Sequence, residues 1–67
     1  MMPLNLAPLK EVQIIAEIHG HSDTLDRMGL AIGTDVTLLD RKSDALVVSV
    51  HGQPVQLTRS LASHIMV

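Results

Sequence analysis

The residues of this chain best suited to chemistry are its four histidines. His19 and His21 stand two positions apart, so in an extended strand their side chains lie on one side, about 6–7 Å apart. Neutral imidazole is a common ligand of transition metals, but that separation frames an ion only with a further ligand, such as Asp23 or His51. We therefore predict that His19, His21 and His51 form a weak site for a divalent transition metal, Fe²⁺ or Zn²⁺. The alternative is that they are surface residues at strand and turn ends.

No arrangement of residues in the sequence indicates catalysis. The serines have no nucleophile motif around them, and no nucleophile is recognisably paired with a general base. The sequence also lacks the Gly-x-x-x-x-Gly-Lys-Ser/Thr segment with which P-loop nucleotide hydrolases cradle phosphates. We therefore predict that the protein is not an enzyme and requires no cofactor.

Composition restricts the class of protein and of partner. The 67 residues are predicted to form one domain, 1–67, and they include no cysteine, so neither disulfides nor thiolate metal sites support the core. There is no Phe, Tyr or Trp on which bases could stack, and the net charge of −2 opposes binding to a phosphate backbone. Nucleic acid is therefore not the expected partner, and a small RNA-binding barrel is the disfavoured alternative.

The sequence predicts no insertion into a membrane. No apolar run reaches the roughly 20 residues that span a bilayer. The first ten residues lack the basic region and the long apolar region of a secretory signal. We expect a cytoplasmic protein, and a homo-oligomer is compatible with this sequence.

Hydrophobic periodicity predicts a mainly β domain. Prolines at positions 3 and 8 favour an extended lead-in with Leu4 and Leu6 available to pack. Residues 11–19 alternate between apolar and polar, which predicts a first strand with Val12, Ile14, Ala16 and Ile18 on its buried face. Further strands are predicted at 35–39, 45–51, 55–57 and 65–67. About five short strands with brief connections favour a small sheet that closes into a barrel.

A short helix is predicted between the first two strands. Ser22 or Asp23 can cap its start, because side-chain oxygens of these types accept hydrogen bonds from free N–H groups. Gly29 follows the last helical turn at the position where many helices end in left-handed backbone. Leu25 and Leu30 then occupy the two sites whose side chains touch in a Schellman cap.

Three further positions are predicted to shape the chain locally. Gly33 suits a positive φ in the turn that leads into the second strand, where a residue with a Cβ loses roughly 1–2 kcal/mol. Gly52 suits a tight hairpin turn between the strands at 45–51 and 55–57. Thr58 is the expected N-cap of a helical turn near the C-terminus.

The order of these parts resembles the FeoA family, small cytoplasmic proteins and domains of bacterial ferrous iron uptake with an SH3-like β-barrel fold. The most specific matching block is Gly-Leu-x-x-Gly-Thr-x-Val at 29–36, which is joined by "VHGQPVQL" at 50–57 and an Ala-x-x-Ile ending at 62–65. The resemblance covers nearly the whole chain. It implies an SH3-like barrel of about five strands, with one short helix between strands one and two and a helical turn near the C-terminus.

The resemblance also implies a function and a partner. It implies a non-enzymatic accessory role at the inner face of the cytoplasmic membrane, through binding to the cytoplasmic part of a FeoB-type transporter. An alternative role is that of an interaction module in a metal-responsive regulator system, and another is a small metal-binding domain that uses His19 and His21. The predicted partner surface is the helix and its exit, consisting of Leu25, Arg27, Met28, Leu30 and Ile32. The competing interpretation is that Leu25, Met28 and Leu30 only cover the barrel.

Overall fold

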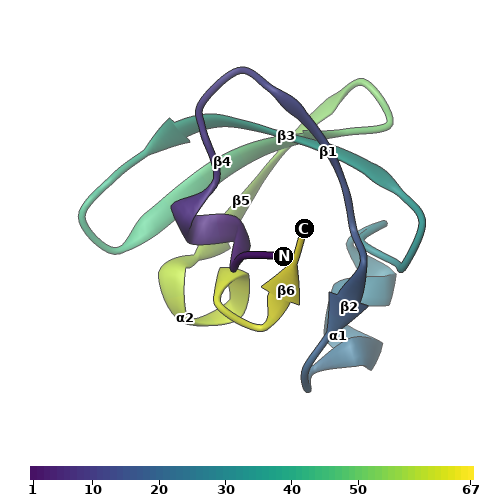
Figure 1. Ribbon diagram of the computed structural model, residues 1–67. Coiled ribbons are helices and arrows are strands. Elements are labelled where there is room, and N and C mark those ends of the chain that lie inside the picture. Colours follow the sequence, from purple (N-terminus) through teal and green to yellow (C-terminus); the bar gives the residue numbers. More distant parts are fainter.

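The computed structural model, which describes residues 1–67, consists mainly of short strands, with a few short helices between them (Figure 1). Their order confirms the predicted mainly β class. The elements are the 3₁₀ turn η1 (Leu4–Leu6), β1 (Val12–Ile14), β2 (Glu17–Ile18), α1 (Ser22–Arg27), β3 (Asp35–Arg41), β4 (Ala45–Val50), β5 (Gln53–Thr58), α2 (Arg59–Ala62) and β6 (Ile65–Met66).

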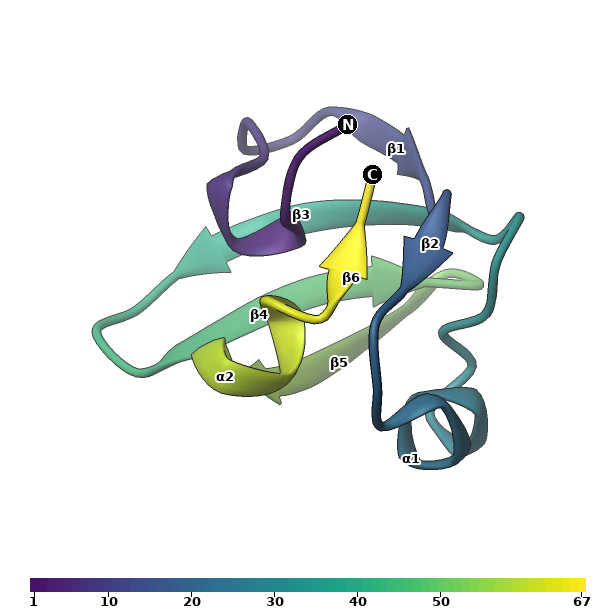
Figure 2. The same ribbon diagram turned by 60° about the horizontal axis from the view of Figure 1, so that its bottom comes forward.

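The strands form two antiparallel sheets that face each other. The larger sheet has the order β1-β3-β4-β5, and the smaller one is the pair β2-β6. Figure 2 shows the small pair lying on the concave side of the larger sheet. The register between β3 and β4 shifts between Leu38 and Asp40, which indicates a bulge at Leu39. Such a bulge bends a strand, and here it adds to the curvature of the large sheet.

The two ends of the chain are held together and tied to the barrel. Met2 and Val67 exchange backbone hydrogen bonds of 2.9 and 2.8 Å, so the termini lie side by side (Figure 1). The Arg41 guanidinium donates to the carbonyl oxygens of Asn5 and Ala7 at 3.1 and 2.6 Å. The lead-in, predicted as extended chain, is therefore anchored at both ends, and it contains the turn η1.

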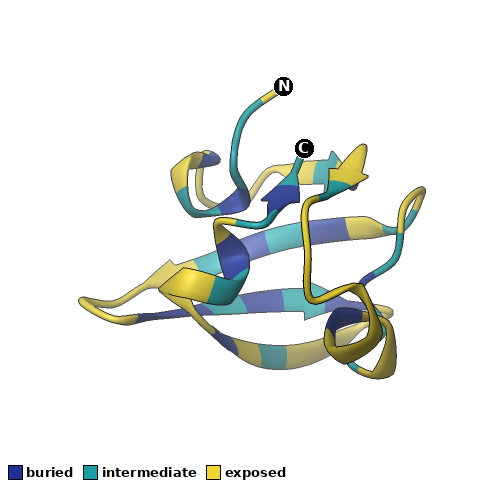
Figure 3. Cartoon of the chain, turned by 90° about the horizontal axis from the view of Figure 1, so that it is seen from below, coloured by how far each residue is buried: buried dark blue, intermediate teal, exposed yellow.

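A single apolar core fills the space between the two sheets. Buried residues come from β3, β4, β5 and β6 but from neither β1 nor β2, and they lie toward the inside of the molecule in Figure 3. No polar or charged residue is buried, so the core rests on aliphatic packing alone. The core cluster consists of Leu4, Ala7, Ile15, Leu25, Leu30, Val36, Leu38, Leu46, Val48, Val50, Leu57, Ala62 and Ile65.

The predicted first strand at 11–19 is wrong in its continuity and in its buried face. It is split into β1 and β2, and Val12, Ile14 and Ala16 are exposed whereas Ile15 is buried. The physical reason is a change of partner within the segment. The backbone N–H of Ile15 still donates to the carbonyl of Thr34, just before β3 of the large sheet. The N–H of Ala16 instead donates to the carbonyl of Met66 in β6 of the small sheet. The alternation of apolar and polar residues contains no information on such a change of hydrogen-bonding partner.

The other predicted strands are confirmed, with shifted ends. β3 and β5 extend beyond the predicted segments, while β6 is shorter than predicted. Val36 and Leu38 on β3 and Leu57 on β5 are buried, as their alternation predicted. None of the helices has the length and apolar character needed to traverse a bilayer.

The predicted start of the first helix is wrong, and its predicted end is confirmed. The N-cap of α1 is His21, in left-handed backbone and with no side-chain hydrogen bond, so neither Ser22 nor Asp23 acts as the cap. At the other end, the Leu30 N–H bonds the Leu25 carbonyl at 2.9 Å, and Gly29 has φ of +84°. This is the Schellman arrangement, and both leucines are buried.

The remaining local predictions are confirmed. Gly33 has φ of +90° in the turn before β3. His51 and Gly52, with φ of +53° and +75°, form the two-residue connection between β4 and β5. The Thr58 hydroxyl accepts a 3.1 Å hydrogen bond from the Leu61 N–H and caps α2. Each of these features depends on residues close together in sequence, which is why the sequence could predict them.

Candidate functional site

The end of α1 forms a corner that is built against the large sheet. Gly29 lies beside the β4–β5 hairpin, where an added Cβ would be 3.6 Å from Val50 and 3.5 Å from the His51 ring. Leu25 and Leu30 extend from this corner into the core. The helix is short, and short helices are held mainly by tertiary packing rather than by their own propensity. The corner is therefore a fixed part of the barrel.

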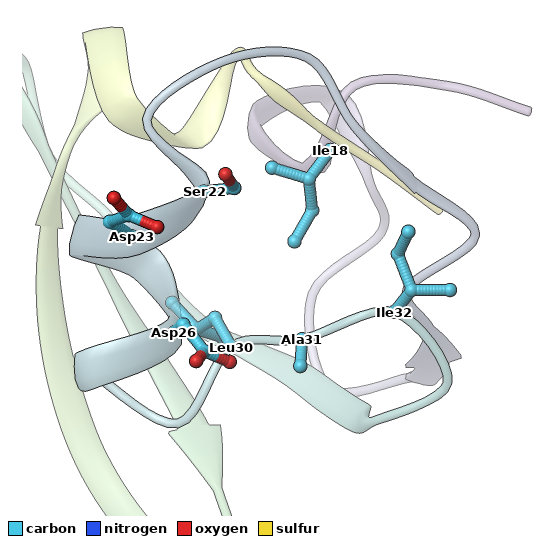
Figure 4. Close-up of a pocket in the computed structure, with 7 residues that line it drawn as sticks. All are labelled: Ile18, Ser22, Asp23, Asp26, Leu30, Ala31 and Ile32. Atoms are coloured by element: carbon cyan, nitrogen blue, oxygen red, sulfur yellow. The ribbon is translucent and has the colours of Figure 1, made fainter.

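A hollow lies between α1 and the segment that follows it, on the side toward β2. We call it the α1 hollow, and its volume is about 280 Å³. Figure 4 shows Asp23 and Asp26 on the helix facing Ile18 and Ile32 across the space. The lining residues are Ile18, Ser22, Asp23, Asp26, Leu30, Ala31 and Ile32.

The α1 hollow has an apolar side and an acidic side. Ile18 is half-buried, and Ile32 is 66% exposed, so both offer apolar surface to a partner. Asp23 and Asp26 are exposed and form no ion pair, since the single ion pair of the chain joins His19 and Glu17. No basic side chain lines the hollow. Its free carboxylates therefore favour a partner that carries positive charge.

The structure divides the five residues of the predicted partner surface into two groups. Leu25 and Leu30 have no exposed surface and belong to the core, although Leu30 also lines the α1 hollow. Arg27 is exposed, Met28 is half-buried against the core, and neither lines the hollow. Ile32 alone is both well exposed and in the hollow. The surface a partner could reach is thus smaller than the predicted one.

The sequence interpretation missed five of the residues that line the hollow. They are Ile18, Ser22, Asp23, Asp26 and Ala31. One signal could have found the two carboxylates, because residues three apart on a helix lie on one face. No local pattern connects them with Ile18 or Ile32, which come from β2 and from the loop before β3.

The three predicted metal ligands are not brought together. The His19 ring bonds the Glu17 carboxylate at 2.7 Å, and the His51 ring lies beside Gly29 at the hairpin. The His21 ring instead faces the ring of His64, with 4.8 Å between the ring centroids. No group of three or more His, Asp or Glu side chains is placed to hold a metal ion.

A family model and several solved structures resemble this chain. The model of the FeoA domain matches residues 2–67. An iron uptake regulatory protein (FeoA) of known crystal structure is 24% identical, with a TM-score of 0.89 over 97% of this chain and 90% of that one. FeoA of Stenotrophomonas maltophilia, crystallised with zinc and described as an SH3 domain protein, is 19% identical, with a TM-score of 0.83 over 98% and 88%.

The same fold also forms part of a longer protein. ScaR with bound Cd²⁺ is 30% identical, with a TM-score of 0.84 over 97% of this chain but only 34% of ScaR. No curated protein sequence is significantly similar to the chain. The likeness to the solved structures confirms the predicted SH3-like fold.

Proposed function

The chain belongs to the FeoA domain family, whose members are non-enzymatic accessory proteins, and we propose that it serves ferrous iron uptake by binding the cytoplasmic part of a FeoB-type transporter. It would then act at the inner face of the cytoplasmic membrane through this partner. The single observation that carries the proposal is the α1 hollow, which combines apolar surface with free carboxylates.

The shape of the α1 hollow suits a side chain of another protein better than a free small molecule. Ligand pockets for drug-sized molecules measure roughly 300–1,000 Å³ and are mostly enclosed. The hollow, at about 280 Å³, lies below that range, and Asp23, Asp26 and Ile32 at its margin are exposed. The expected partner segment inserts one apolar side chain against Ile18 and Ile32 and places a Lys or Arg beside the carboxylates.

A pair of matched substitutions tests the site. Ile32 and Ile14 are exposed to similar extents, 66% and 60%, but only Ile32 lines the hollow. Ile32→Asp is expected to weaken binding to the isolated cytoplasmic domain of the FeoB-type transporter from the same organism at least tenfold by calorimetry. Ile14→Asp is the control and is expected to leave the affinity unchanged. Equal affinities of both variants and the parent would overturn the site.

Two further variants separate the hollow from the surface predicted by the sequence. Met28→Asp and Arg27→Glu alter the helix exit without altering the lining of the hollow. If these two weaken binding and Ile32→Asp does not, the partner contacts the helix exit instead. If the parent itself does not bind the transporter domain, the proposed partner is wrong.

A second function is favoured by the similarity to ScaR, in which this fold occupies about a third of the chain. In this second function the domain acts as an interaction module of a metal-responsive regulator system rather than of a transporter. Affinity purification from the native organism with crosslinking, repeated with Ile32→Asp, separates the two. Loss of a FeoB-type transporter from the captured proteins supports the first function, and loss of a DNA-binding regulator supports the second.

A further inference from the structure

Two histidines from distant parts of the sequence form a pair at the start of α1. The rings of His21 and His64 have centroids 4.8 Å apart and an interplanar angle of 61°. His21 precedes α1, and His64 lies between α2 and β6. From this pair we propose that the protein binds one divalent transition metal ion between the two imidazoles, with water completing the coordination.

The backbone around the pair holds both rings in place. Gly20 and His21 have φ of +96° and +56°, and this turn directs the chain from β2 into α1 next to His64. His19 and His64 are joined twice, because the His19 N–H bonds the His64 carbonyl at 2.7 Å and the His64 ring bonds the His19 carbonyl. Left-handed backbone at a residue other than glycine costs roughly 1–2 kcal/mol. His21 keeps this unfavourable backbone conformation in the turn that brings the two rings together.

The hydrogen bond of His64 prepares its ring for a metal. Its Nδ1 lies 2.5 Å from the His19 carbonyl oxygen and must donate to it, because a carbonyl only accepts. In the neutral ring the lone pair is then on Nε2. A backbone carbonyl is one of the common outer partners that fix the second nitrogen of metal-ligating histidines, along with carboxylates and water. No protein atom bonds the His21 ring, so its nitrogens are free to bind an ion.

The spacing of the rings matches a shared ion. Two imidazoles bound to one zinc ion by bonds of about 2.0–2.1 Å have ring centroids roughly 5 Å apart. The observed separation is 4.8 Å. His21 is exposed and His64 is half-buried, so water can reach the remaining coordination positions. The proposed site has two protein ligands where zinc sites usually have three or four, so a weak affinity is expected.

The chemistry of the ligands sets the order of preference among metals. Imidazole nitrogen suits zinc, copper, iron and nickel, but affinities for divalent ions rise from Fe²⁺ through Ni²⁺ to Cu²⁺. The His21–His64 site should therefore bind Zn²⁺ or Ni²⁺ more tightly than Fe²⁺. It differs from the site predicted by the sequence, since His19 contributes its backbone carbonyl as the positioning group and His51 takes no part. The site is independent of the proposed partner and its hollow.

Titration of the whole chain with zinc chloride tests the proposal. Calorimetry is expected to show saturable binding of one ion per chain with a Kd below about 1 mM. His21→Asn keeps a residue that tolerates left-handed backbone, and it should weaken binding at least tenfold, as should His64→Gln. His51→Asn is the matched control, because it also replaces an exposed histidine in left-handed backbone, and it should bind zinc like the parent.

A second measurement does not depend on how the variants fold. In ¹⁵N spectra of the histidine side chains of the parent, zinc is expected to shift ring nitrogens of His21 and His64 and to leave those of His51 unchanged. Several outcomes would overturn the site. They are no saturable binding below about 1 mM, equal zinc affinity of parent and His21→Asn, shifts confined to His19 or His51, or zinc binding that requires two chains by sedimentation.

Discussion

The α1 hollow and the outer face of β1 both keep aliphatic side chains in water, but they differ in shape and charge. Val12 and Ile14 on β1 are 67% and 60% exposed, which is close to the 66% of Ile32 in the hollow. β1 lies at the edge of the large sheet and no pocket adjoins it. The hollow is concave, and it adds two unpaired carboxylates.

This difference shows why exposed apolar residues alone do not define a site. Single apolar side chains on a protein surface are common and need no explanation. An edge strand is protected from pairing with other chains when it is short and flanked by charges. β1 has three residues and follows Lys10 and Glu11, so it meets that description. Concavity together with unpaired charge distinguishes the α1 hollow.

The largest expected difference between the two regions is in stability. Leu30→Ala should lower the free energy of unfolding by about 2–5 kcal/mol, because it removes a fully buried side chain beneath the hollow. Ile14→Ala on β1 should change it by about 0.5 kcal/mol or less. Urea denaturation followed by circular dichroism measures both. Equal losses would mean that the α1 corner is not part of the core.

The next largest expected difference between the α1 hollow and β1 is in the effect of charge reversal on binding. Asp26→Lys is expected to weaken binding to the FeoB cytoplasmic domain about a hundredfold, near 2.8 kcal/mol, because a basic partner group would then meet a like charge. Glu11→Lys makes the same change in net charge beside β1 and should have little effect. Both are measured by calorimetry at two salt concentrations. If the two variants bind alike, only the overall charge matters and the hollow is not the contact.

The glycine at the corner should give a smaller effect on stability. Gly29→Ala is expected to cost about 1–2 kcal/mol, because φ is +84° there. The contacts that the new Cβ would make, 3.5–3.6 Å from His51 and Val50, are ordinary, so the backbone is the main cause. Gly29→Asn should cost less, since Asn tolerates this conformation better. A larger loss for Asn than for Ala in thermal unfolding would contradict the backbone explanation.

The smallest expected effect concerns the two helix starts. Thr58→Ala removes the cap of α2 and should cost about 1 kcal/mol of unfolding free energy. Ser22→Ala should change it by less than about 0.5 kcal/mol, because Ser22 caps nothing and faces the α1 hollow. Chemical denaturation of both variants measures the difference. If Ser22→Ala lowered the free energy of unfolding as much as Thr58→Ala, the Ser22 hydroxyl would act as a helix cap and not only as part of the lining of the hollow.

Features built from neighbouring residues could be predicted from the sequence. The Schellman end at Gly29, the turns at Gly33 and Gly52 and the cap at Thr58 are all confirmed. Each depends on backbone conformation and on hydrogen bonds within a few residues. The assignment to the FeoA family is also confirmed, and it too was made from short sequence blocks at fixed spacings.

Features that depend on two distant segments could not be predicted in this way. The burial of Ile15 rather than Ile14 follows from the move between two sheets, and the cap at His21 follows from a left-handed turn against His64. The α1 hollow likewise needs Ile18 beside Asp26. Periodicity reports which residues share a face of one element, and it contains no information on which element that face will meet.

The sequence by itself therefore determined the class of fold, the family and the local ends of the helices and turns, because these are encoded in composition and short-range geometry. Only the tertiary structure decided which apolar residues face water and which histidines meet. It set His64 beside His21, 43 positions earlier in the chain. It also placed two carboxylates opposite Ile18 and Ile32. The physical reason is that packing of the two sheets brings these groups together.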